Sequence, residues 1–275
     1  MQRVFLITGS SRGLGRELAR AALAAGNLVV ATARDSTAVQ DLADAHPDTA
    51  RAITLDVTDP QAAEAAVQVA VRDFGRLDVL INNAGYANVA SIEDTSLADF
   101  RAQVETNLWG AVNVTKAALP VLRQQRGGHV VQLSSVSGRL APAAGLGAYV
   151  TAKFALEGFS EALAVEVAPF GVRVSIVEPG AMATTLATSM TLPEPEAHYA
   201  EALAPMLNLY GGPQAGQYGT DPARAAALIP GLLDLPEPPL WFPLSADALH
   251  YIRAGEQRKL AELDRWADLS RSVNA

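Results

Sequence analysis

Short apolar runs rich in β-branched residues recur along the first two thirds of the chain. They occupy residues 3–8, 28–33, 52–57, 78–82, 129–134 and 172–177. Most are nearly continuous in apolar residues, which is typical of strands that are covered on both faces. Longer segments with helical periodicity separate them, at 13–25, 36–45, 60–74, about 97–123 and 148–168. This alternation predicts an α/β fold with a parallel sheet and right-handed crossovers.

Capping residues indicate where two of these helices begin. Asp59 precedes Pro60 at the start of one segment, and Ser96 precedes the segment that begins at residue 97. Short polar side chains at such positions accept hydrogen bonds from the free N–H groups of a first helical turn. We therefore predict an N-cap at both positions.

The composition of the chain changes after Gly180. Residues 183–220 are rich in proline, glycine and large apolar side chains. We interpret them as an elaboration on the sheet within a single domain that spans 1–275. A helix at 221–234, a short strand at 240–244 and a charged terminal helix are expected to follow. In that last helix, we expect Trp266 to pack inward and the charged residues to face solvent.

Composition and charge disfavour several classes of protein. The 275 residues carry a net charge of −8 and include no cysteine, which argues against nucleic-acid binding, disulfides and thiolate metal sites. The four histidines are scattered without a metal-binding spacing, so no metal is expected. No apolar run is long enough for a membrane span, and the first is followed too soon by glycine for a signal peptide. We expect a soluble cytoplasmic protein.

A glycine-rich loop follows the first predicted strand. The sequence TGSSRGLG places Gly9, Gly13 and Gly15 between that strand and the next predicted helix. Glycines let the backbone approach a diphosphate closely, and the free N–H groups of the helix start favour an anion. This context predicts a nucleotide site, and the alternative is a plain structural turn.

A tyrosine and a lysine lie four residues apart in the segment AYVTAK. Residues with this spacing share one face of a helix, so Tyr149 and Lys153 would be neighbours. A free tyrosine titrates near ~10, and an ammonium about 4 Å away would lower the pKa of the phenol by about three units. The pair is a candidate for proton transfer, but the same spacing also occurs in ordinary amphipathic helices.

Six short motifs occur in order along the chain. They are TGSSRGLG, NNAG at 82–85, NLWG at 107–110, LSSVSG at 133–138, YVTAK at 149–153 and EPG at 178–180. Together they resemble the short-chain dehydrogenase/reductase family over about the first two thirds of the chain. The stretch 153–180 is similar to the branch that includes hydroxysteroid and retinol dehydrogenases and bacterial ketone reductases. The resemblance implies a Rossmann-type, doubly wound parallel sheet with helices on both faces, and reversible hydride transfer with NAD(P)(H).

The resemblance also implies catalytic roles. Tyr149 matches the family's general acid/base, and Lys153 matches the lysine that lowers its pKa and holds the nicotinamide ribose. Ser135 matches the serine that hydrogen-bonds the substrate oxygen. Ser134 and Ser137 are rivals for that role, since serines at strand ends often only satisfy backbone groups.

Other matches leave alternatives open. Asn107 resembles the family's fourth catalytic residue, which orders a water between Lys153 and solvent; the alternative is an asparagine that only kinks its helix. Asp56 matches an adenine contact or a cap, and Asn82 either borders the cofactor or stabilises the sheet. Thr184 matches a nicotinamide contact, a helix N-cap, or both. The implied cofactor-binding residues are Gly9, Ser11, Arg12, Gly13, Leu14, Gly15, Arg34, Asp56, Val57, Asn83, Ala84, Gly85, Tyr149, Lys153, Pro179, Gly180 and Thr184.

The end of the second predicted strand indicates the choice of cofactor. In a dinucleotide fold, an acid there binds the ribose 2′-hydroxyl of NAD, whereas an arginine accepts the 2′-phosphate of NADP. By the family pattern, Ala33 occupies the usual acid position, and Arg34 follows it, with Arg12 available from the glycine loop. In the competing interpretation Asp35 reaches the ribose, but this acid is better placed to start the next helix. We predict that NADP(H) is preferred over NAD(H).

Large apolar side chains after Gly180 predict an apolar pocket for a ketone or secondary alcohol. They are Met182, Leu186, Met190, Leu192, Tyr199, Met206, Leu207, Leu209 and Tyr210. The alternative is that they mostly pack this segment against the domain. By the family resemblance, helices 97–123 and 148–168 would form subunit interfaces, so we expect a homodimer or homotetramer.

Other functions fit the residues less well. The sequence GFSEA around Ser160 lacks the final glycine of a serine-hydrolase motif. A non-catalytic protein that senses dinucleotides on the same fold typically loses the tyrosine or the lysine, and both are present. The TGxxxGxG spacing and the length argue against an epimerase or dehydratase. A small-molecule carbonyl or alcohol is therefore the expected substrate.

Overall fold

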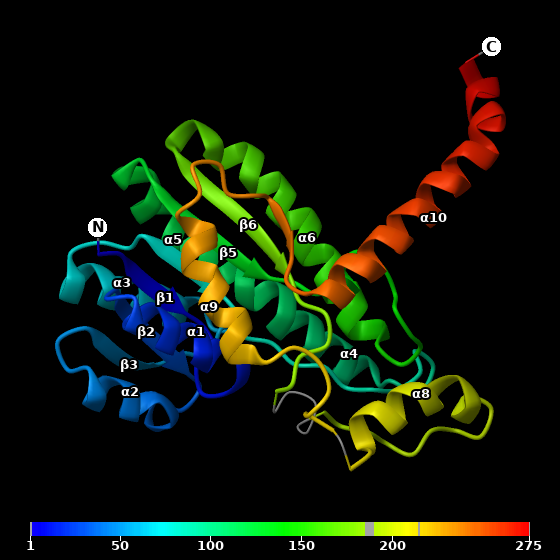
Figure 1. Cartoon of the computed structure of the whole chain (residues 1–275), viewed down its shortest axis with the longest axis horizontal. Helices are drawn as coiled ribbons and strands as arrows, with labels where there is room; N and C mark the ends of the chain where they lie inside the picture. Colours follow the sequence, from blue (N-terminus) through cyan, green and yellow to red (C-terminus); the bar gives the residue numbers. More distant parts are fainter. Residues whose placement is uncertain (1, 185–189, 214, 275) are drawn as a thin grey trace.

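A seven-stranded sheet forms the centre of the computed structural model, which describes residues 2–184, 190–213 and 215–274 (Figure 1). All strand pairs are parallel, in the order β3-β2-β1-β4-β5-β6-β7. The strands are β1 (Val4–Ile7), β2 (Leu28–Ala33), β3 (Ala50–Thr54), β4 (Val79–Asn82), β5 (Gly128–Leu133), β6 (Val172–Glu178) and β7 (Trp241–Pro243). The predicted parallel α/β arrangement is confirmed.

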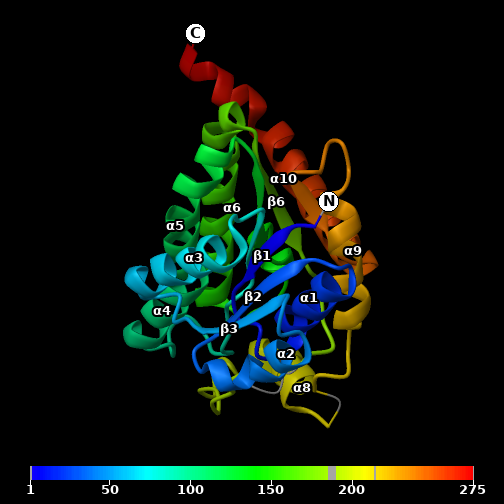
Figure 2. The same cartoon turned by 90° about the vertical axis from the view of Figure 1, so that its left-hand side faces the viewer.

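Helices cover both faces of this sheet (Figure 2). One face carries α1 (Gly13–Ala24), α2 (Gln40–Ala45) and α9 (Pro222–Leu233). The other carries α3 (Pro60–Phe74), α5 (Gly110–Gln125) and α6 (Gly147–Val167). The remaining elements are α4 (Leu97–Val104), α8 (Ala200–Gly211), α10 (Ala246–Arg271) and the short turns η1 (Ser36–Val39), η2 (Glu105–Trp109), η3 (Val136–Gly138), η4 (Ala168–Phe170) and η5 (Ser272–Asn274).

Strand β1 shows why the apolar runs are continuous. Phe5 and Ile7 point into the core under α1, α2 and α9, whereas Val4 and Leu6 point into the core under α3, α5 and α6. All four side chains are buried. Successive residues of a strand face opposite sides of a sheet, so a sheet with two buried faces requires apolar residues at every position.

Local signals located several boundaries correctly. The Asp59 side chain accepts hydrogen bonds from the N–H groups of Gln61 and Ala62, and Ser96 accepts one from Asp99. Both predicted N-caps are therefore confirmed. Asp35 likewise accepts a hydrogen bond from the N–H of Thr37 at the start of η1.

Two predicted boundaries were wrong. The third strand ends at Thr54 and not at residue 57, because Asp56 accepts hydrogen bonds from the N–H and hydroxyl of Thr58 and turns the chain out of the sheet. The helix predicted over 97–123 is divided into α4 and α5 by the π-helical turn η2, which contains Asn107. Such turns occur often at functional sites.

The strand order reverses between β1 and β4, so the chain winds outward from there in both directions. The loops that follow these two strands lie together, since Thr8 Oγ1 accepts the N–H groups of Asn83 and Ala84. Asn82 is buried and donates to Thr115 Oγ1 and Gln132 Oε1. These hydrogen bonds agree with one of the two roles predicted for Asn82, the stabilisation of the sheet. The crevice at such a reversal is where open α/β sheets bind ligands.

The terminal helix α10 runs away from the body of the protein toward the C-terminus (Figure 1). Trp266 is 46% exposed, and its Nε1 donates to Glu262 Oε1 on the same helix. The prediction that Trp266 packs inward was wrong, because this part of α10 has extended beyond the core. In the described parts of the chain, none of the helices combines the length and the apolar character needed to cross a membrane.

His129 is a buried titratable group in the sheet. Its Nε2 lies 2.9 Å from Ser175 Oγ, and Ser175 Oγ donates to the Pro239 carbonyl oxygen at 2.7 Å. The serine oxygen therefore accepts a hydrogen bond from Nε2–H. Burial, with smaller effects of Arg173 and Arg3, lowers the pKa of His129 to about 4. The folded state thus holds a neutral imidazole.

We predict that His129 makes stability depend on pH. Its pKa is about 4 in the folded protein and 6.5 as a free side chain, so protonation favours the unfolded chain. The contribution of neutral His129 to the free energy of unfolding is complete above pH ~6.5 and is lost as the pH falls toward ~4. Between pH ~7.5 and ~5, the free energy of unfolding falls by about 2 kcal/mol through this group. Urea denaturation at both pH values should show that His129→Gln loses about 2 kcal/mol less than the wild type.

A variant at the exposed His46 provides the control for this prediction. His46→Gln should follow the wild-type dependence. Equal pH sensitivity of His129→Gln and the wild type would show that burial does not suppress protonation of His129.

Candidate active site

A cleft of about 1080 Å³ lies at the carboxyl ends of the central strands. All four predicted catalytic residues and every predicted cofactor-binding residue line it. They come from the segments that follow β1 to β6 and from α1, η2 and α6. The parallel topology therefore brings together motifs that are far apart in the sequence.

The glycine loop allows a close approach of two backbone segments. Gly9 has a φ of +67°, and a Cβ atom there would lie 2.9 Å from the Ala84 Cα. A Cβ atom on Gly15 would overlap Asn83 Nδ2 and the Gly9 carbonyl oxygen. Side chains at these positions would separate the loop from the residues after β4 and fill the floor of the cleft.

The start of α1 offers donors to an anion. Arg12 occupies the N-cap position, and within the described chain no side chain makes a capping hydrogen bond to this helix. The first turn also contains no acidic residue. The N–H groups of a helix start favour phosphate, and Gly13 and Leu14 line the cleft. The loop, the helix start and the cleft together fit a dinucleotide.

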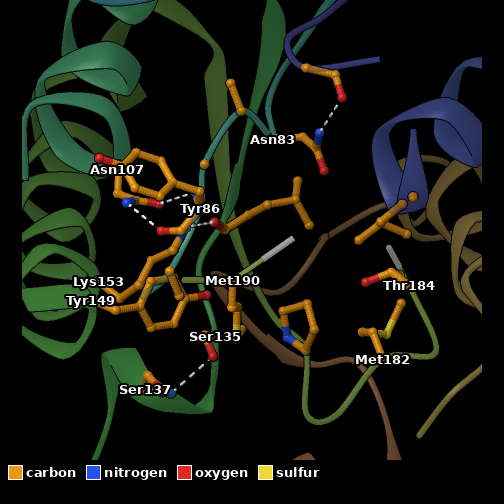
Figure 3. Close-up of a pocket in the computed structure, with 18 of the residues that line it drawn as sticks. Asn83, Tyr86, Asn107, Ser135, Ser137, Tyr149, Lys153, Met182, Thr184 and Met190 are labelled. Atoms are coloured by element: carbon orange, nitrogen blue, oxygen red, sulfur yellow. Dashed lines mark hydrogen bonds between the residues drawn. The ribbon is translucent and has the colours of Figure 1, made fainter. Parts of the chain in front are cut away.

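The predicted catalytic side chains lie together on one side of the cleft, with Met182 and Thr184 opposite (Figure 3). Lys153 Nζ lies 5.6 Å from the centre of the Tyr149 ring. The Ser135 hydroxyl lies close enough to the Tyr149 phenol to lower its pKa. The arrangement places a hydroxyl, a phenol and an ammonium within reach of one bound group.

The pKa of Tyr149 differs from the sequence-based expectation. Loss of solvation raises it to about 12, and the hydrogen bond with Ser135 only partly offsets this. The predicted lowering by Lys153 was therefore wrong for this structure. Lys153 is itself buried, donates to the Leu133 carbonyl oxygen at 2.6 Å, and has its Nζ over the Tyr149 ring.

Burial also lowers the pKa of Lys153. It falls to about 8 from 10.5, while the negative charge of Glu157 acts in the opposite direction. The pKa falls because an ammonium with 4% exposure has lost most of its hydration. Both partners of the predicted proton-transfer pair thus favour their neutral forms more than the free side chains do.

The three candidate serines have different partners. Ser134 is buried and donates to Glu157 Oε1 at 2.7 Å, and Ser137 is also buried. Ser135 is partly exposed in the cleft, and its Oγ accepts the N–H of Ser137 at 3.1 Å. All three line the cleft, and Ser135 is the most exposed of them, so its contact to a substrate oxygen stays a prediction.

Asn107 connects the π-helical turn η2 to the loop after β4. Its Nδ2 donates to the carbonyl oxygens of Tyr86 and Gln103, and its Oδ1 accepts the N–H of Tyr86. The side chain is buried at the edge of the cleft. These hydrogen bonds explain why an asparagine lies in this turn, and its catalytic role beside Lys153 stays a prediction.

The loop after β6 contains a contact that the sequence analysis missed. Asp247 Oδ2 accepts the N–H of Ala181 at 2.9 Å, and a side chain at Gly180 would overlap the same carboxylate. Asp247 and Tyr251 line the cleft from α10. The glycine at position 180 indicates that another group lies close by, but no sequence motif indicates that this group comes from α10.

Thr184 lies opposite the glycine loop, where a Cβ atom on Gly13 would be 3.5 Å from the Thr184 Cβ. Its alternative role, as the cap of a following helix, falls on residues 185–189, outside the described residues. Leu186, one of the predicted pocket residues, also falls there.

The other apolar residues predicted for the pocket divide into two groups. Met182, Met190, Met206, Leu209 and Tyr210 line the cleft. Leu192 and Leu207 pack in the small core around Val89 and Leu146, and the Tyr199 hydroxyl donates to Glu93 at the surface. Met190, Met206 and Tyr210 also pack in that small core, so both interpretations of this segment apply.

Comparison with known proteins identifies the family. Residues 3–195 match the sequence profile described as short chain dehydrogenase. The oxidoreductase BOA17 of Botryotinia fuckeliana is 42% identical over 275 residues, which cover 98% of each chain. The protein belongs to the short-chain dehydrogenase family. It is therefore an NAD(P)-binding oxidoreductase.

Solved structures of short-chain dehydrogenases show the same fold. One from Streptomyces avermitilis is 41% identical, with a TM-score of 0.90 and coverage of 99% of this chain and 98% of the other. An alcohol dehydrogenase from Thermococcus sibiricus in complex with 5-hydroxy-NADP is 27% identical, with a TM-score of 0.71 and coverage of 88% and 95%. The predicted family and doubly wound single-domain fold are confirmed.

Proposed function

We propose that this protein interconverts a ketone and a secondary alcohol on a largely apolar small molecule and prefers NADP(H). The observation that carries the proposal is the meeting of Ser135, Tyr149 and Lys153 in the cleft that also contains the glycine loop. The similarity to an alcohol dehydrogenase supports the reaction class. Residues 183–220 serve as the substrate loop in this proposal.

Tyr149 acts as the general acid. A nicotinamide bound in the cleft supplies the hydride for reduction and accepts it in the reverse direction. With a pKa of about 12, the Tyr149 phenol is protonated at neutral pH, so it is ready to donate its proton to a carbonyl oxygen. Ser135 donates a second hydrogen bond to that oxygen as negative charge develops on it. The resting protonation state favours carbonyl reduction.

Lys153 and Asn107 support the phenol. The Lys153 ammonium stabilises the phenolate that remains after proton transfer. A Cβ atom on Gly85 would overlap Asn107 Oδ1 and lie 3.9 Å from Lys153 Nζ, so the asparagine and lysine approach the same small residue. We place the return of the proton along this side, from solvent to Lys153.

The cofactor preference rests on the end of β2. Asp35 uses its carboxylate to cap η1 and is absent from the cleft lining, whereas Ala33 and Arg34 line the cleft. The planar guanidinium of Arg34 suits a 2′-phosphate. Position 33 holds alanine and not an acid, so no carboxylate there repels the phosphate. Asp56 is occupied by its turn with Thr58, and Arg34 lies close enough to act on its charge. These contacts favour NADP over NAD.

We predict that Tyr149→Phe abolishes turnover and leaves cofactor binding nearly intact, because the phenyl ring keeps the packing and lacks the proton. Lys153→Ala should impair both, since the ammonium also contacts the ribose in this proposal. Steady-state rates on a panel of ketones with NADPH, with fluorescence titration of the cofactor, measure the two effects. A Tyr149→Phe rate above about one tenth of wild type would exclude Tyr149 as the general acid. Absence of turnover by the wild type on a broad panel would favour a non-catalytic dinucleotide sensor.

We predict that Ala33→Asp combined with Arg34→Ala shifts the ratio of kcat/KM values from NADP toward NAD. The new carboxylate repels the 2′-phosphate and accepts a hydrogen bond from a 2′-hydroxyl. Asp35→Asn, which leaves the cleft lining unchanged, is the control and should retain the wild-type preference. A tenfold preference of the wild type for NAD would contradict the proposed role of Arg34.

We propose a homodimer or homotetramer formed through the long helices on the α5 and α6 side. Trp109, Phe154 and Val165 are large apolar residues exposed there, with Val165 at 78%. Burying such side chains between subunits favours association. Light scattering at micromolar concentration should give the mass of at least two chains, and a monomer would contradict the proposal.

A further inference from the structure

A cluster of buried charges lies beside the catalytic residues and has no role in the proposed reaction. Glu157 on α6 and Glu178 at the end of β6 are 3% and 0% exposed. Arg139, directly after η3, lies 3.2 Å from Glu178 Oε1 and 3.9 Å from Glu157 Oε2. Glu157 Oε2 and Glu178 Oε2 have no hydrogen-bond partner among the described residues. Buried carboxylates that share one arginine are costly, so their presence requires an explanation.

Glu157 is linked to the predicted catalytic residues through α6. Tyr149, Lys153 and Glu157 are spaced by four residues and share one face of the helix. Lys153 donates to the carbonyl oxygen of Leu133, and Glu157 accepts the hydroxyl of the next residue, Ser134. Both side chains therefore hold the end of β5, from which Ser135 follows.

The backbone around Glu157 is shaped to admit its carboxylate. A Cβ atom on Gly138 would overlap Glu157 Oε1 and Ser134 Oγ. The glycine that ends the LSSVSG motif thus leaves room for a carboxylate from α6. The contact between Glu157 and Ser134 depends on this glycine, because any larger residue at 138 would displace the Glu157 carboxylate.

The contacts indicate which of the two buried acids carries a charge. Glu157 accepts the short hydrogen bond from Ser134, and Arg139 and Lys153 both favour its ionised form. Glu178 has Arg139 as its partner and is repelled by Glu157 and Glu256, and burial raises its pKa to about 7. Burial also raises the pKa of Glu157, but with more groups acting against it. These contacts favour the ionised form more strongly in Glu157 than in Glu178.

We propose that Glu157 is a positioning residue that supplies the buried negative charge which keeps Lys153 protonated beside Tyr149. Its role in turnover rests on the function proposed above for Tyr149 and Lys153. The charged groups that face Glu157 from its own helix and from the elements packed against it, directly or through Arg139, are Lys153, Glu161, Arg139, Glu178, Glu256 and Lys259. Of the acids in this cluster, Glu157 is the one whose negative charge raises the pKa of Lys153.

The size of the effect is sufficient to matter at neutral pH. With its pKa at about 8, Lys153 is protonated in roughly nine of ten molecules at pH ~7. If loss of the Glu157 charge lowered the pKa of Lys153 by about one unit, the protonated fraction at pH ~7 would fall to about half. The loss would affect the proton-transfer step, since Glu157 is separated from the cleft by Lys153 and Ser134.

The chain offers a direct measurement of this coupling, because it contains only three lysines, Lys116, Lys153 and Lys259. Lysine labelled with 13C at Cε gives one side-chain signal for each, and Lys116→Arg and Lys259→Arg assign them. In the wild type, the Lys153 signal should titrate near pH 8. In Glu157→Gln, which keeps an oxygen for Ser134, the midpoint should fall by about one pH unit.

Two variants distinguish charge from packing. Glu157→Asp keeps the charge and should titrate close to the wild type, and Glu161→Gln removes an exposed acid one turn further along α6 and should leave the midpoint unchanged. Glu157→Met, of similar length and without charge, replaces the glutamine variant if that protein does not fold. An unchanged Lys153 midpoint in a folded, uncharged variant overturns the proposal.

The pH dependence of activity provides an independent test of the proposal. In the enzyme with NADPH and a ketone, the alkaline limb of the kcat profile should move to lower pH in Glu157→Gln by the same amount as the Lys153 midpoint, with KM little changed. A shifted Lys153 midpoint without any wild-type turnover would refute the proposed function and leave the electrostatic role of Glu157 intact. A fall in melting temperature with an unmoved midpoint would show a merely structural role.

Discussion

The hydrogen bond from Lys153 Nζ to the Leu133 carbonyl oxygen, at 2.6 Å, holds the long helix α6 against the end of β5. Because α6 presents Tyr149 one turn before the lysine and Glu157 one turn after it, this bond sets the position of three functional groups at once. Ser135 follows Leu133 by two residues, so the same bond also sets its distance from the phenol. The β5 end is in turn joined to β6 by the N–H of Ser134 to Val177 and of Val136 to Pro179. A buried ammonium without this partner would be costly to keep, which makes the geometry of the site inseparable from the burial of one lysine.

Much of this arrangement is encoded in short-range patterns. Continuous apolar runs indicated buried strands, and Asp59 and Ser96 indicated helix starts, because each signal depends on the backbone within a few residues. The motif residues could be assigned to one cleft for a related reason. In a parallel sheet the carboxyl ends of the strands lie on one edge, so residues that follow strands meet there whatever their separation in sequence.

The features that sequence reasoning missed depend on contacts between distant segments. The pKa of Tyr149 reflects the loss of solvation around the ring, which a spacing of four residues does not reveal. Asp247 reaches Ala181 from a helix near the end of the chain. Trp266 is apolar and lies in an amphipathic segment, yet it is exposed because α10 is longer than the surface beneath it. Periodicity identifies an apolar face of a helix but not whether another element covers that face.

The lack of room for a Cβ atom at Gly138, beside the Glu157 carboxylate, has an evolutionary consequence. Gly138 ends the LSSVSG motif and Glu157 lies on α6 outside the six motifs, but the Glu157 side chain occupies the space beside Gly138. We therefore expect that a chain with a side chain at 138 needs a shorter residue at 157 or loses the contact with Ser134. In an alignment of related chains the two columns should covary, with glycine at 138 wherever glutamate is retained at 157. An apparently permissive small residue is thus a record of an acid nineteen positions away.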